Sequence, residues 1–424
     1  MEDLVRHLGF GAHTMSINCR HCGLPVKHSF CDLGMSPLAN SYLSEAEIDR
    51  AEVFLPLHTY VCSNCLLVQL RVFEAPDSIF SDYLYFSSYS QSWLDHARSY
   101  SLAVIERFGL DASSQVIEIG SNDGYLLKNF VGAGISALGI EPAANVAAVA
   151  QQHGIPTQVA FFGTVLAQQL SAEGRLADLL IGNNVLAHVP DLNDFVGGMS
   201  VVLAPGGVIT MEFPHLLQLM EQNQFDTIYH EHFSYFSLLT ARTVFDVNEL
   251  RIFDVEQIPT HGGSLRIFAC HRRFGGHRTT RRVHDLVDAE RRAGLGDLNG
   301  HLGFQERVQR VKRNLLRFLI DARESGCSVV AYGAPAKGNT LLNHCGVKSD
   351  LVDYTVDRSP HKQGLFLPGT HLPIYAPSHI RETRPDYVLI LPWNLSAEIA
   401  SEMSFIRDWG GKFVVPIPEL SIIE

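Results

Sequence analysis

A short run of polar residues near the middle of the chain has the composition of a proton-transfer site. Tyr229, His230, Glu231 and His232 are consecutive. On a helix, Tyr229 and His232 would share one face, because they are three positions apart, and His230 would then point elsewhere. Histidine is the natural base near neutral pH, and the adjacent carboxylate of Glu231 is able to orient it and stabilise its protonated form. The alternative interpretation is an ordinary polar end of a helix.

A further histidine, His188, stands before Val189 and Pro190 in a predicted turn. Taken by itself, this residue either joins the proton-transfer site or caps the helix that follows. Both interpretations remain open on the residues alone.

Four cysteines have the spacing of a metal site. Each of the two pairs fits a tight knuckle with both sulfurs facing one point, and two knuckles supply four thiolates for tetrahedral zinc. Such a site leaves no place for water or substrate, so we expect a structural Zn²⁺. Four buried free thiols, or His21 or His58 as a ligand, are the alternatives. The predicted ligands are Cys19, Cys22, Cys62 and Cys65.

The elements that must position these residues include a glycine turn after residue 119. Residues 115–120 are typical of a buried strand, and the turn 121–124 leads into an apolar helix, which is the opening of a parallel α/β unit. Gly120 and Gly124 let the backbone approach a ligand closely. Glu141 ends the next strand about 20 residues beyond the turn, where a carboxylate suits two ribose hydroxyls.

The glycine turn favours S-adenosylmethionine (SAM) over a dinucleotide. A dinucleotide site needs G-x-G-x-x-G, whereas Glu118 and Asp123 place acidic groups near both ends of this turn. Acidic groups would repel a pyrophosphate but suit the ammonium of methionine. With strand 177–184 and strand 208–212, the order resembles class I SAM methyltransferases over roughly residues 113–215. The expected SAM contacts are Gly120, Asn122, Asp123, Gly124, Glu141, Pro142 and Asn183.

The C-terminal part has the pattern of a second Rossmann-like sheet. A helix is predicted over 306–325, followed by strands at 327–332, 351–356 and 387–391. In the turn 333–340, Lys337 precedes the second glycine, so the ATP-binding P-loop pattern fails, and Pro335 breaks the dinucleotide pattern. A helix N-terminus with Lys337 still suits the pyrophosphate of a sugar nucleotide; a purely structural turn is the alternative. Further candidates for this contact are Arg266, Arg358 and Lys362.

Length and charge limit the possible classes of protein. A chain of 424 residues exceeds one core by the rough prior of 100 to 200 residues per domain, so we expect three domains. A net charge of −12 argues against a surface for nucleic acid. No apolar run reaches the roughly 20 residues that a bilayer requires, and the N-terminus does not resemble a secretory signal. We therefore expect a cytoplasmic protein with no membrane and no nucleic-acid partner.

Several segments together resemble the sugar C-methyltransferases, which act on nucleotide-linked 4-keto-6-deoxy sugars. The resemblance spans nearly the whole chain and implies a zinc-binding domain over 14–75, a methyltransferase domain over 76–245 and a C-terminal Rossmann-like domain over 246–424. In this family the segment matching Tyr83 to Ser88 covers the methionine end of the cofactor. The segments that carry the resemblance are 19–65, 83–88, 118–124, 183–191, 229–232 and 261–264.

The resemblance also implies a mechanism, in which a base removes the proton next to the ketone and the enolate attacks the methyl group of SAM. It assigns the base to His232, with Glu231 orienting it or balancing its charge. Tyr229 and His188 are candidates to bind the C4 oxygen or shuttle a proton, and the two histidines could exchange roles. We expect methylation at C3, with C5 open, on a TDP- or GDP-linked sugar. The expected substrate contacts are His261, Gly262, Arg266, Lys337, Asn339 and Arg358.

Three other functions compete with this prediction. An O- or N-methyltransferase of a small polar metabolite would need no base for a C–H bond. A nucleotide-sugar oxidoreductase would need a dinucleotide fingerprint in the C-terminal sheet, and a zinc-ribbon adaptor would leave two nucleotide-type sheets unexplained. We expect a monomer, because the three domains are able to cover one another.

Overall fold

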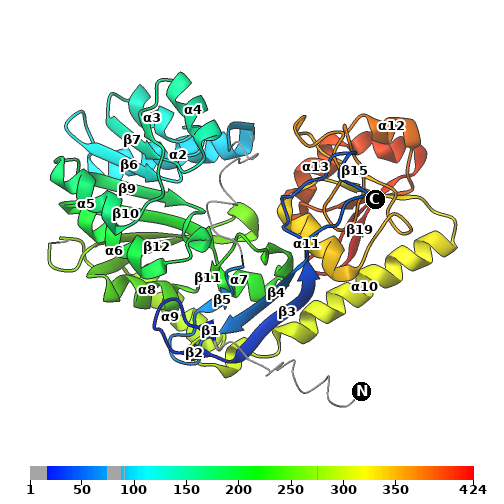
Figure 1. The fold of residues 1–424 in the computed structure, drawn as a ribbon, viewed down its shortest axis with the longest axis horizontal. Coiled ribbons are helices and arrows are strands. Elements are labelled where there is room, and N and C mark those ends of the chain that lie inside the picture. The colour runs from blue at the N-terminus through cyan, green and yellow to red at the C-terminus, as the bar shows by residue number, and fades with distance from the viewer. Residues whose placement is uncertain (1–16, 74–86, 90, 275) are drawn as a thin grey trace, which may run out of the picture.

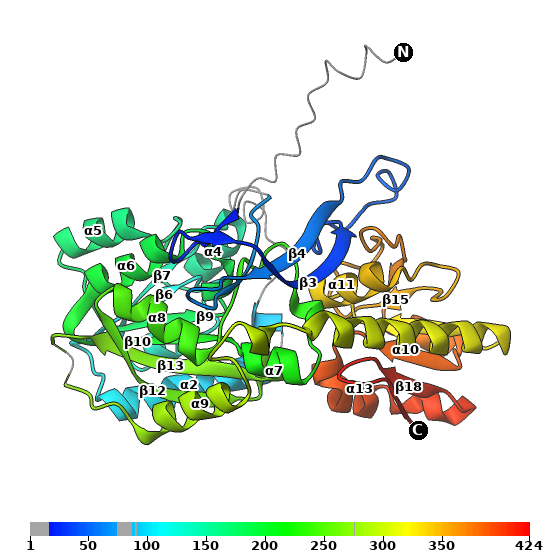
Figure 2. The ribbon, with the colours of Figure 1, turned by 90° about the horizontal axis from the view of Figure 1, so that it is seen from below.

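The computed structural model describes residues 17–73, 87–89, 91–274 and 276–424. Figure 1 shows a large α/β lobe, coloured cyan to green, and a smaller lobe, coloured orange to red. The strands β3 (His28–Ser36) and β4 (Leu55–Val61) lie between the two lobes, and Figure 2 shows the same arrangement from below. Within the described ranges, no helix is both long and apolar enough to cross a membrane.

The large lobe is built on a seven-stranded sheet with the order β12-β13-β10-β9-β6-β7-β8. The strands from β6 to β10 run parallel to their neighbours, and β13 lies antiparallel between β10 and β12. The strands are β6 (Gln115–Ile119), β7 (Ser136–Ile140), β8 (Thr157–Gln158), β9 (Ala177–Asn183), β10 (Leu203–Pro214), β12 (Leu250–Ile258) and β13 (Ser264–His271). The helices are α2 (Gln91–Phe108), α3 (Leu127–Gly132), α4 (Ala144–Gln152), α5 (Thr164–Ala172), α6 (Leu192–Val202), α7 (Leu216–Glu221), α8 (Leu238–Val247) and α9 (Arg281–Arg292).

This sheet confirms the predicted methyltransferase-type α/β fold. The strands predicted from residue 115, residue 137 and residue 177 are β6, β7 and β9, and the predicted strand 208–212 lies within β10. Their side chains are buried on both faces, as expected for parallel strands covered by helices. The sheet also takes β12 and β13 from beyond residue 245, where the sequence places a domain boundary. The predicted boundaries themselves stay predictions.

The N-terminal region forms two small antiparallel sheets. One pairs β1 (Ile17–Asn18) with β2 (Pro25–Val26), and the other has the order β11-β5-β4-β3. Its strand β5 (Val68–Leu70) pairs with β11 (Ser234–Tyr235), which follows His232 along the chain. Phe30 of β3 stacks on Phe304 of α10 (Phe304–Glu324) with ring centroids 5.0 Å apart. The N-terminal strands thus share a core with the C-terminal region.

The smaller lobe contains the second sheet that the sequence predicted, with the order β16-β15-β14-β17-β18-β19 and only β19 antiparallel. The predicted strand 351–356 is shorter than expected, because residues 348–352 form a turn. In this turn the carbonyl of Lys348 accepts hydrogen bonds from the N–H groups of Leu351 and Val352. The strands are β14 (Val329–Tyr332), β15 (Thr355–Val356), β16 (Ile374–Tyr375), β17 (Tyr387–Ile390), β18 (Lys412–Val415) and β19 (Ser421–Ile423). The helices beside α10 are α11 (Ala336–Cys345), α12 (His379–Thr383) and α13 (Ser396–Glu402).

One buried carboxylate joins three elements of the large lobe. Glu290 of α9 accepts hydrogen bonds from the backbone N–H groups of Leu238 and Leu239, at 2.6 and 2.9 Å, at the start of α8. It also accepts one from Nε2 of His215, at 2.7 Å, directly after β10. Both side chains are buried. A carboxylate at a helix N-terminus satisfies N–H groups that have no partner within the helix.

Replacing Glu290 by Ala is therefore expected to lower the free energy of unfolding by roughly 3 kcal/mol, because it leaves buried donors without an acceptor. Glu290→Gln keeps one acceptor oxygen and should cost less. Urea unfolding followed by circular dichroism measures both variants. The exposed Glu106 of α2 provides the control, since Glu106→Ala should change stability by no more than about 0.5 kcal/mol. Equal effects of all three substitutions would contradict the assigned role of Glu290.

Candidate active site and metal centre

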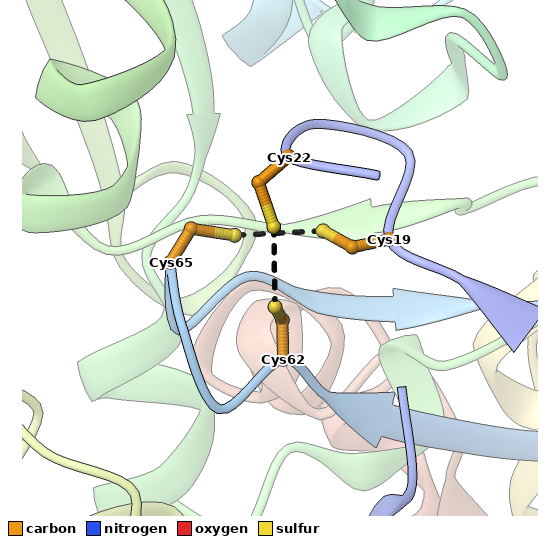
Figure 3. A group of neighbouring side chains, drawn as sticks. All are labelled: Cys19, Cys22, Cys62 and Cys65. Carbon is orange, nitrogen blue, oxygen red and sulfur yellow. Dashed lines mark hydrogen bonds between the residues drawn. The ribbon is translucent and has the colours of Figure 1, made fainter. Parts of the chain in front are cut away.

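The four predicted zinc ligands converge on one point, as Figure 3 shows. Their sulfurs all lie within 4.8 Å of one another. The first knuckle turns at Gly23 (φ 74°) and the second at Leu66 (φ 61°). Tetrahedral zinc with Zn–S bonds of about 2.3 Å places thiolates about 3.8 Å apart. The cluster thus fits a closed Zn²⁺ site, formed by Cys19, Cys22, Cys62 and Cys65.

The two histidines that might have replaced a cysteine are engaged elsewhere. Nδ1 of His21 lies 3.0 Å from Oδ1 of Asn193, and His58 is bonded to Ser29 at 2.7 Å. A side-chain amide, that of Gln69, donates to Sγ of Cys19 at 3.2 Å. Donors of this kind commonly orient metal-bound thiolates.

The first knuckle also contacts the segment that carries His188. Arg20, between the first two cysteines, donates to the carbonyl of Pro190 at 3.3 Å and to that of Leu70. Asn193 donates to the carbonyl of His21 at 2.8 Å. The metal centre therefore stabilises the position of the loop after β9 as well as the N-terminal sheets.

A cavity of about 850 Å³ lies where the three regions of the chain meet. Residues 38 and 40–42 of the N-terminal region, the carboxyl ends of β6, β7 and β9, and residues 335–337 and 362 of the C-terminal region all line it. Polar groups from all three regions of the chain therefore line the same cavity. Those predicted from the sequence are Asn122, Glu141, Asn183, His188, Tyr229, Glu231, His232, His261, Lys337 and Lys362.

One end of the cavity has the features of a SAM site. Gly120 has a φ of 67°, and a Cβ there would lie 2.7 Å from Cγ2 of Val185. Both oxygens of Glu141 accept backbone N–H groups, those of Asn122 and Ala143, at 2.9 Å each. This fixes the Glu141 carboxylate at the end of β7, where ribose hydroxyls would reach it.

The acidic group that begins the turn also fits a cationic cofactor. Glu118 is fully buried, and in the described part of the chain neither of its carboxyl oxygens has a hydrogen-bond partner. Burial, together with the charges of Glu141 and Asp123, raises the pKa of Glu118 well above its usual value. An ammonium placed near this turn would offset that cost. The chemistry of the donors and acceptors therefore fits the methionine part of SAM.

The remaining predicted cofactor residues lie in the glycine turn or beside it. The backbone N–H of Ser87 donates to Oδ1 of Asn122 at 2.9 Å, and that of Ser88 donates to Asp123 at 3.1 Å. Gly124 (φ 77°) closes the turn against Ile155. Pro142 lines the cavity. Tyr83 lies outside the described residues.

The predicted catalytic run forms a turn rather than a helix, in which the backbone N–H of His232 donates to the carbonyl of Tyr229 at 2.9 Å. Nδ1 of His232 lies 2.8 Å from the carbonyl oxygen of Thr227. A carbonyl only accepts, so Nδ1 carries the proton and Nε2 accepts from the hydroxyl of Tyr229, at 2.8 Å. Burial, followed by the influence of His188, lowers the pKa of His232 well below its usual value. His232 is therefore neutral, with its basic nitrogen next to Tyr229.

The other two predicted catalytic residues lie beside this pair. The ring of His188 lies 4.7 Å from that of His232, centroid to centroid, and burial lowers the pKa of His188 to about 4. The carboxylate of Glu231 is buried, which raises its pKa to about 7. In the described chain, the hydrogen bond to this carboxylate comes from Nδ2 of Asn40, at 2.6 Å. The Thr227 carbonyl, not Glu231, thus holds Nδ1 of His232.

The opposite end of the cavity is cationic. Lys337 stands in the first turn of α11, over the ring of Trp393 at 4.5 Å. Burial lowers the pKa of Lys337 to about 8, and the charge of Asp226 partly offsets this effect. Lys362 donates to the carbonyl of Ala334 at 2.8 Å. Two amines from separate segments thus face the same volume.

His261 is placed between the two ends. It has a left-handed backbone (φ 54°), and its Nε2 lies 3.0 Å from Nδ2 of Asn184, which is also left-handed (φ 56°). Conformations of this kind cost free energy and are concentrated at functional sites. Gly262 does not line the cavity, but it packs closely on Trp393, because a Cβ there would lie 2.5 Å from the ring.

Three residues predicted to bind substrate face other partners. Arg266 pairs with Glu212 at 3.0 Å and Glu256 at 3.3 Å within the large sheet. Arg358 is exposed and pairs with Glu402 at 3.3 Å. Asn339 is buried and donates to the carbonyl of Ala39 at 2.6 Å. None of the three lines the cavity, because each side chain is bound by other residues of the chain.

The sequence analysis missed several residues that line the cavity. Asn40 and Tyr42 come from the loop between the two cysteine pairs, and no local pattern marks them. Asn184 was available as the second asparagine at the end of β9, in a position where a left-handed residue often occurs. Trp93, at the start of α2, lies 5.3 Å from His261, ring to ring, and also lines the cavity.

Comparisons with known proteins agree with this arrangement. Three family models match: a zinc binding domain over residues 19–80, a methyltransferase domain over 93–253 and a C-methyltransferase C-terminal domain over 259–418. C-methyltransferase NovU of Streptomyces niveus is 36% identical over 423 residues, which are 100% of this chain and 99% of that protein.

Other relatives match only a part of the chain. A ubiquinone biosynthesis O-methyltransferase of Rhizobium etli is 28% identical over 112 residues, which are 24% of this chain and 45% of the relative. The solved structure of magnesium protoporphyrin IX methyltransferase from Synechocystis PCC 6803, with bound SAM, has 16% identity and a TM-score of 0.33, and covers 46% of this chain and 88% of that one.

Metal analysis of the purified chain is expected to give one zinc per molecule. Cys65→Ser should release it and lower the melting temperature by roughly 5 °C or more, because zinc binding contributes folding free energy. Since Arg20 and His21 join the knuckle to residues 190–193, amide hydrogen exchange should also rise there. Cys327→Ser, outside the cluster, is the control and should keep its zinc. Full zinc retention by Cys65→Ser would contradict a site of four cysteines.

Proposed function

The chain belongs to the C-methyltransferases that combine a zinc-binding domain, a SAM-dependent methyltransferase domain and a C-methyltransferase C-terminal domain, and on this basis we propose that it methylates C3 of a nucleotide-linked 4-keto-6-deoxy sugar. The observation that carries the proposal is the neutral His232, with Tyr229, between an end of the cavity suited to SAM and a cationic end. The carbon next to a ketone becomes a nucleophile only after such a base removes its proton, whereas an oxygen or nitrogen already carries the lone pair that attacks the methyl group.

When bound, SAM supplies an electrophilic methyl group on its sulfonium. Glu141 and Asn183 would hold it, beside the glycine turn at Gly120 and Asn122. All four line the cavity. Among the described residues, the side-chain oxygen of Asn183 has no hydrogen-bond partner, so it is suited to accept a bond from the cofactor.

In the proposed reaction, the proton next to the ketone ends on Nε2 of His232. It moves there directly, or through Tyr229, whose hydroxyl proton passes to Nε2 as the hydroxyl oxygen takes the proton from carbon. The Thr227 carbonyl keeps Nδ1 protonated, so Nε2 is the basic nitrogen. The transfer creates an imidazolium beside an enolate, and their attraction offsets the burial that disfavours a charged His232. His188 and the carboxylate of Glu231 line the same cavity, and we assign them to binding the C4 oxygen and to balancing charge, respectively.

The cationic end supports a diphosphate on the substrate. Lys337 stands at a helix N-terminus, and both features favour phosphate. Lys362 adds a second amine from another segment. We propose that these two groups bind the diphosphate of a TDP- or GDP-sugar.

Incubation with SAM and a panel of nucleotide-linked 4-keto-6-deoxy sugars in deuterated water tests the proposed reaction. Mass spectrometry should show the gain of one methyl group, and nuclear magnetic resonance should place it at C3. Without SAM, deuterium should enter at the same carbon. His232→Ala should lower both rates by at least about 100-fold, as expected for loss of a positioned base. SAM binding by calorimetry is the control for folding of the variant.

If SAM binds but no keto-sugar exchanges deuterium or gains mass, the proposed substrate class is wrong. If the methyl group is found on oxygen, the carbon acceptor is wrong. Loss of methyl transfer in His232→Ala with unchanged deuterium exchange would assign the base to another residue.

Lys337→Met is expected to raise KM for the sugar nucleotide about tenfold or more, because a charge-assisted bond to phosphate is lost, with little change in the Kd of SAM. In the wild type, the lowered pKa of Lys337, about 8, means that the amine is charged below pH 8 and neutral above it. KM should therefore rise as the pH passes 8, and Lys337→Met should lose this dependence. The exposed Lys348 gives the control, Lys348→Met, and an equal effect there would contradict the proposed contact.

A further inference from the structure

A residue of the zinc-binding region reaches the catalytic turn of the large lobe. Nδ2 of Asn40 donates to Oε1 of Glu231 at 2.6 Å, and both residues line the cavity. They are 191 positions apart in the sequence. Glu231 is 5% exposed, so little water can reach its carboxylate to replace this donor. A hydrogen bond to a buried carboxylate is among the stronger polar contacts in proteins.

The loop that carries Asn40 is fixed from the other side by the smaller lobe. Asn339 of α11 donates to the carbonyl of Ala39 at 2.6 Å, directly before Asn40. The hydroxyl of Tyr42 donates to the carbonyl of Ala334 at 2.5 Å, and Lys362 lies 5.1 Å over the Tyr42 ring. The next residue, Leu43, forms a β-bridge with Phe366. Asn40 is thus held between contacts on both sides of it along the chain.

We propose that Asn40 is a positioning residue for the reaction: it fixes the carboxylate of Glu231 in the cavity, and the contacts of Ala39 and Tyr42 with the smaller lobe set its own position. The loop thereby links the turn after β14, where the substrate's diphosphate is expected, to the carboxylate beside His232. The inference rests on the proposed function in one respect, namely that Glu231 takes part in the reaction.

The charge state of Glu231 gives the inference a measurable consequence. Burial raises the pKa of this carboxyl to about 7, and the bond from Asn40 lowers it relative to burial alone. Loss of the amide should therefore raise the pKa further, and the ionised form would be reached only at higher pH. Other titratable groups that line the same cavity include Tyr42, Glu141, His188, Asp191, Asp194, Tyr229, His232, His261, Lys337 and Lys362.

Infrared difference spectroscopy on the full chain tests this without any substrate. The protonated carboxyl band that is present in the wild type and missing in Glu231→Gln reports Glu231 alone. We expect its midpoint near pH 7 in the wild type, and about one pH unit or more higher in Asn40→Ala. Asn40→Asp should raise it further, since a second carboxylate would face the first. Asn339→Ala should cause a smaller shift in the same direction.

Ser41→Ala is the matched control, because Ser41 lines the cavity in the same loop and is not the donor to Glu231. It should leave the midpoint unchanged. Thermal unfolding of each variant shows whether it is folded. If Asn40→Ala does not fold, Asn40→Gln, which keeps the amide, is measured in its place. Asn40→Gln should shift the midpoint less than Asn40→Asp does. An unmoved midpoint in folded Asn40→Ala and Asn40→Asp would overturn the inference.

With an active keto-sugar from the panel, the pH profile of kcat/KM should follow the same order. Its acid limb should move to higher pH in Asn40→Ala and disappear in Glu231→Gln. An infrared shift with no keto-sugar methylated would leave the role of Asn40 standing and reject the proposed substrate. An infrared shift with an unmoved acid limb would show that Glu231 titrates outside the reaction, and would overturn the role of Asn40 as a positioning residue.

Discussion

The pairing of β11 with β5 is the constraint on which the geometry of the site depends. Ser234 and Tyr235 are in register with Gln69 and Val68, so the backbone directly after His232 belongs to the zinc-binding sheet. On the other side, the N–H of Phe233 donates to the carbonyl of Ala187 at 2.7 Å, and this bond brings the turn of His188 against the turn of His232. Gln69 also donates to a zinc ligand, Cys19. One backbone ladder and one side chain therefore connect the metal cluster with both histidines.

Burial disfavours the charged form of several ionisable groups that line the cavity. It lowers the pKa of His188, His232 and His261, and it raises that of Glu141 and Glu231. Such a site disfavours an isolated charge but tolerates a pair of opposite charges at short distance. That property suits a step in which a neutral base and a neutral carbon acid become an imidazolium and an enolate.

Local patterns predicted the elements, and long-range contacts decided which side chains reach the cavity. The two cysteine knuckles, the glycine turn after β6 and the helix α10 each depend on residues within a few positions of one another, so the sequence was sufficient for them. Arg266 does not line the cavity because its acidic partners come from other strands, and the sequence alone gives no register between strands. The contact of Asn40 with Glu231 joins residues 191 positions apart, a distance over which one sequence carries no signal. The segment from Tyr229 to His232 is a turn, and the two side chains still meet, as they would on a helix, because a turn also brings positions three apart together.

The N-terminal region needs a metal because the loop between its two cysteine pairs helps to form the active site. The N-terminal strands are short, and β1 and β2 have two residues each. A unit of this size buries little apolar surface by itself and commonly needs a metal or disulfides for stability. In this chain the N-terminal region also holds Arg20 against the loop after β9 and Asn40 against Glu231. These contacts tolerate little displacement, because a hydrogen bond weakens steeply with distance and angle. A zinc ion closed by four thiolates supplies that rigidity without offering a coordination position to the substrate, so the chemistry stays with the histidines and the tyrosine.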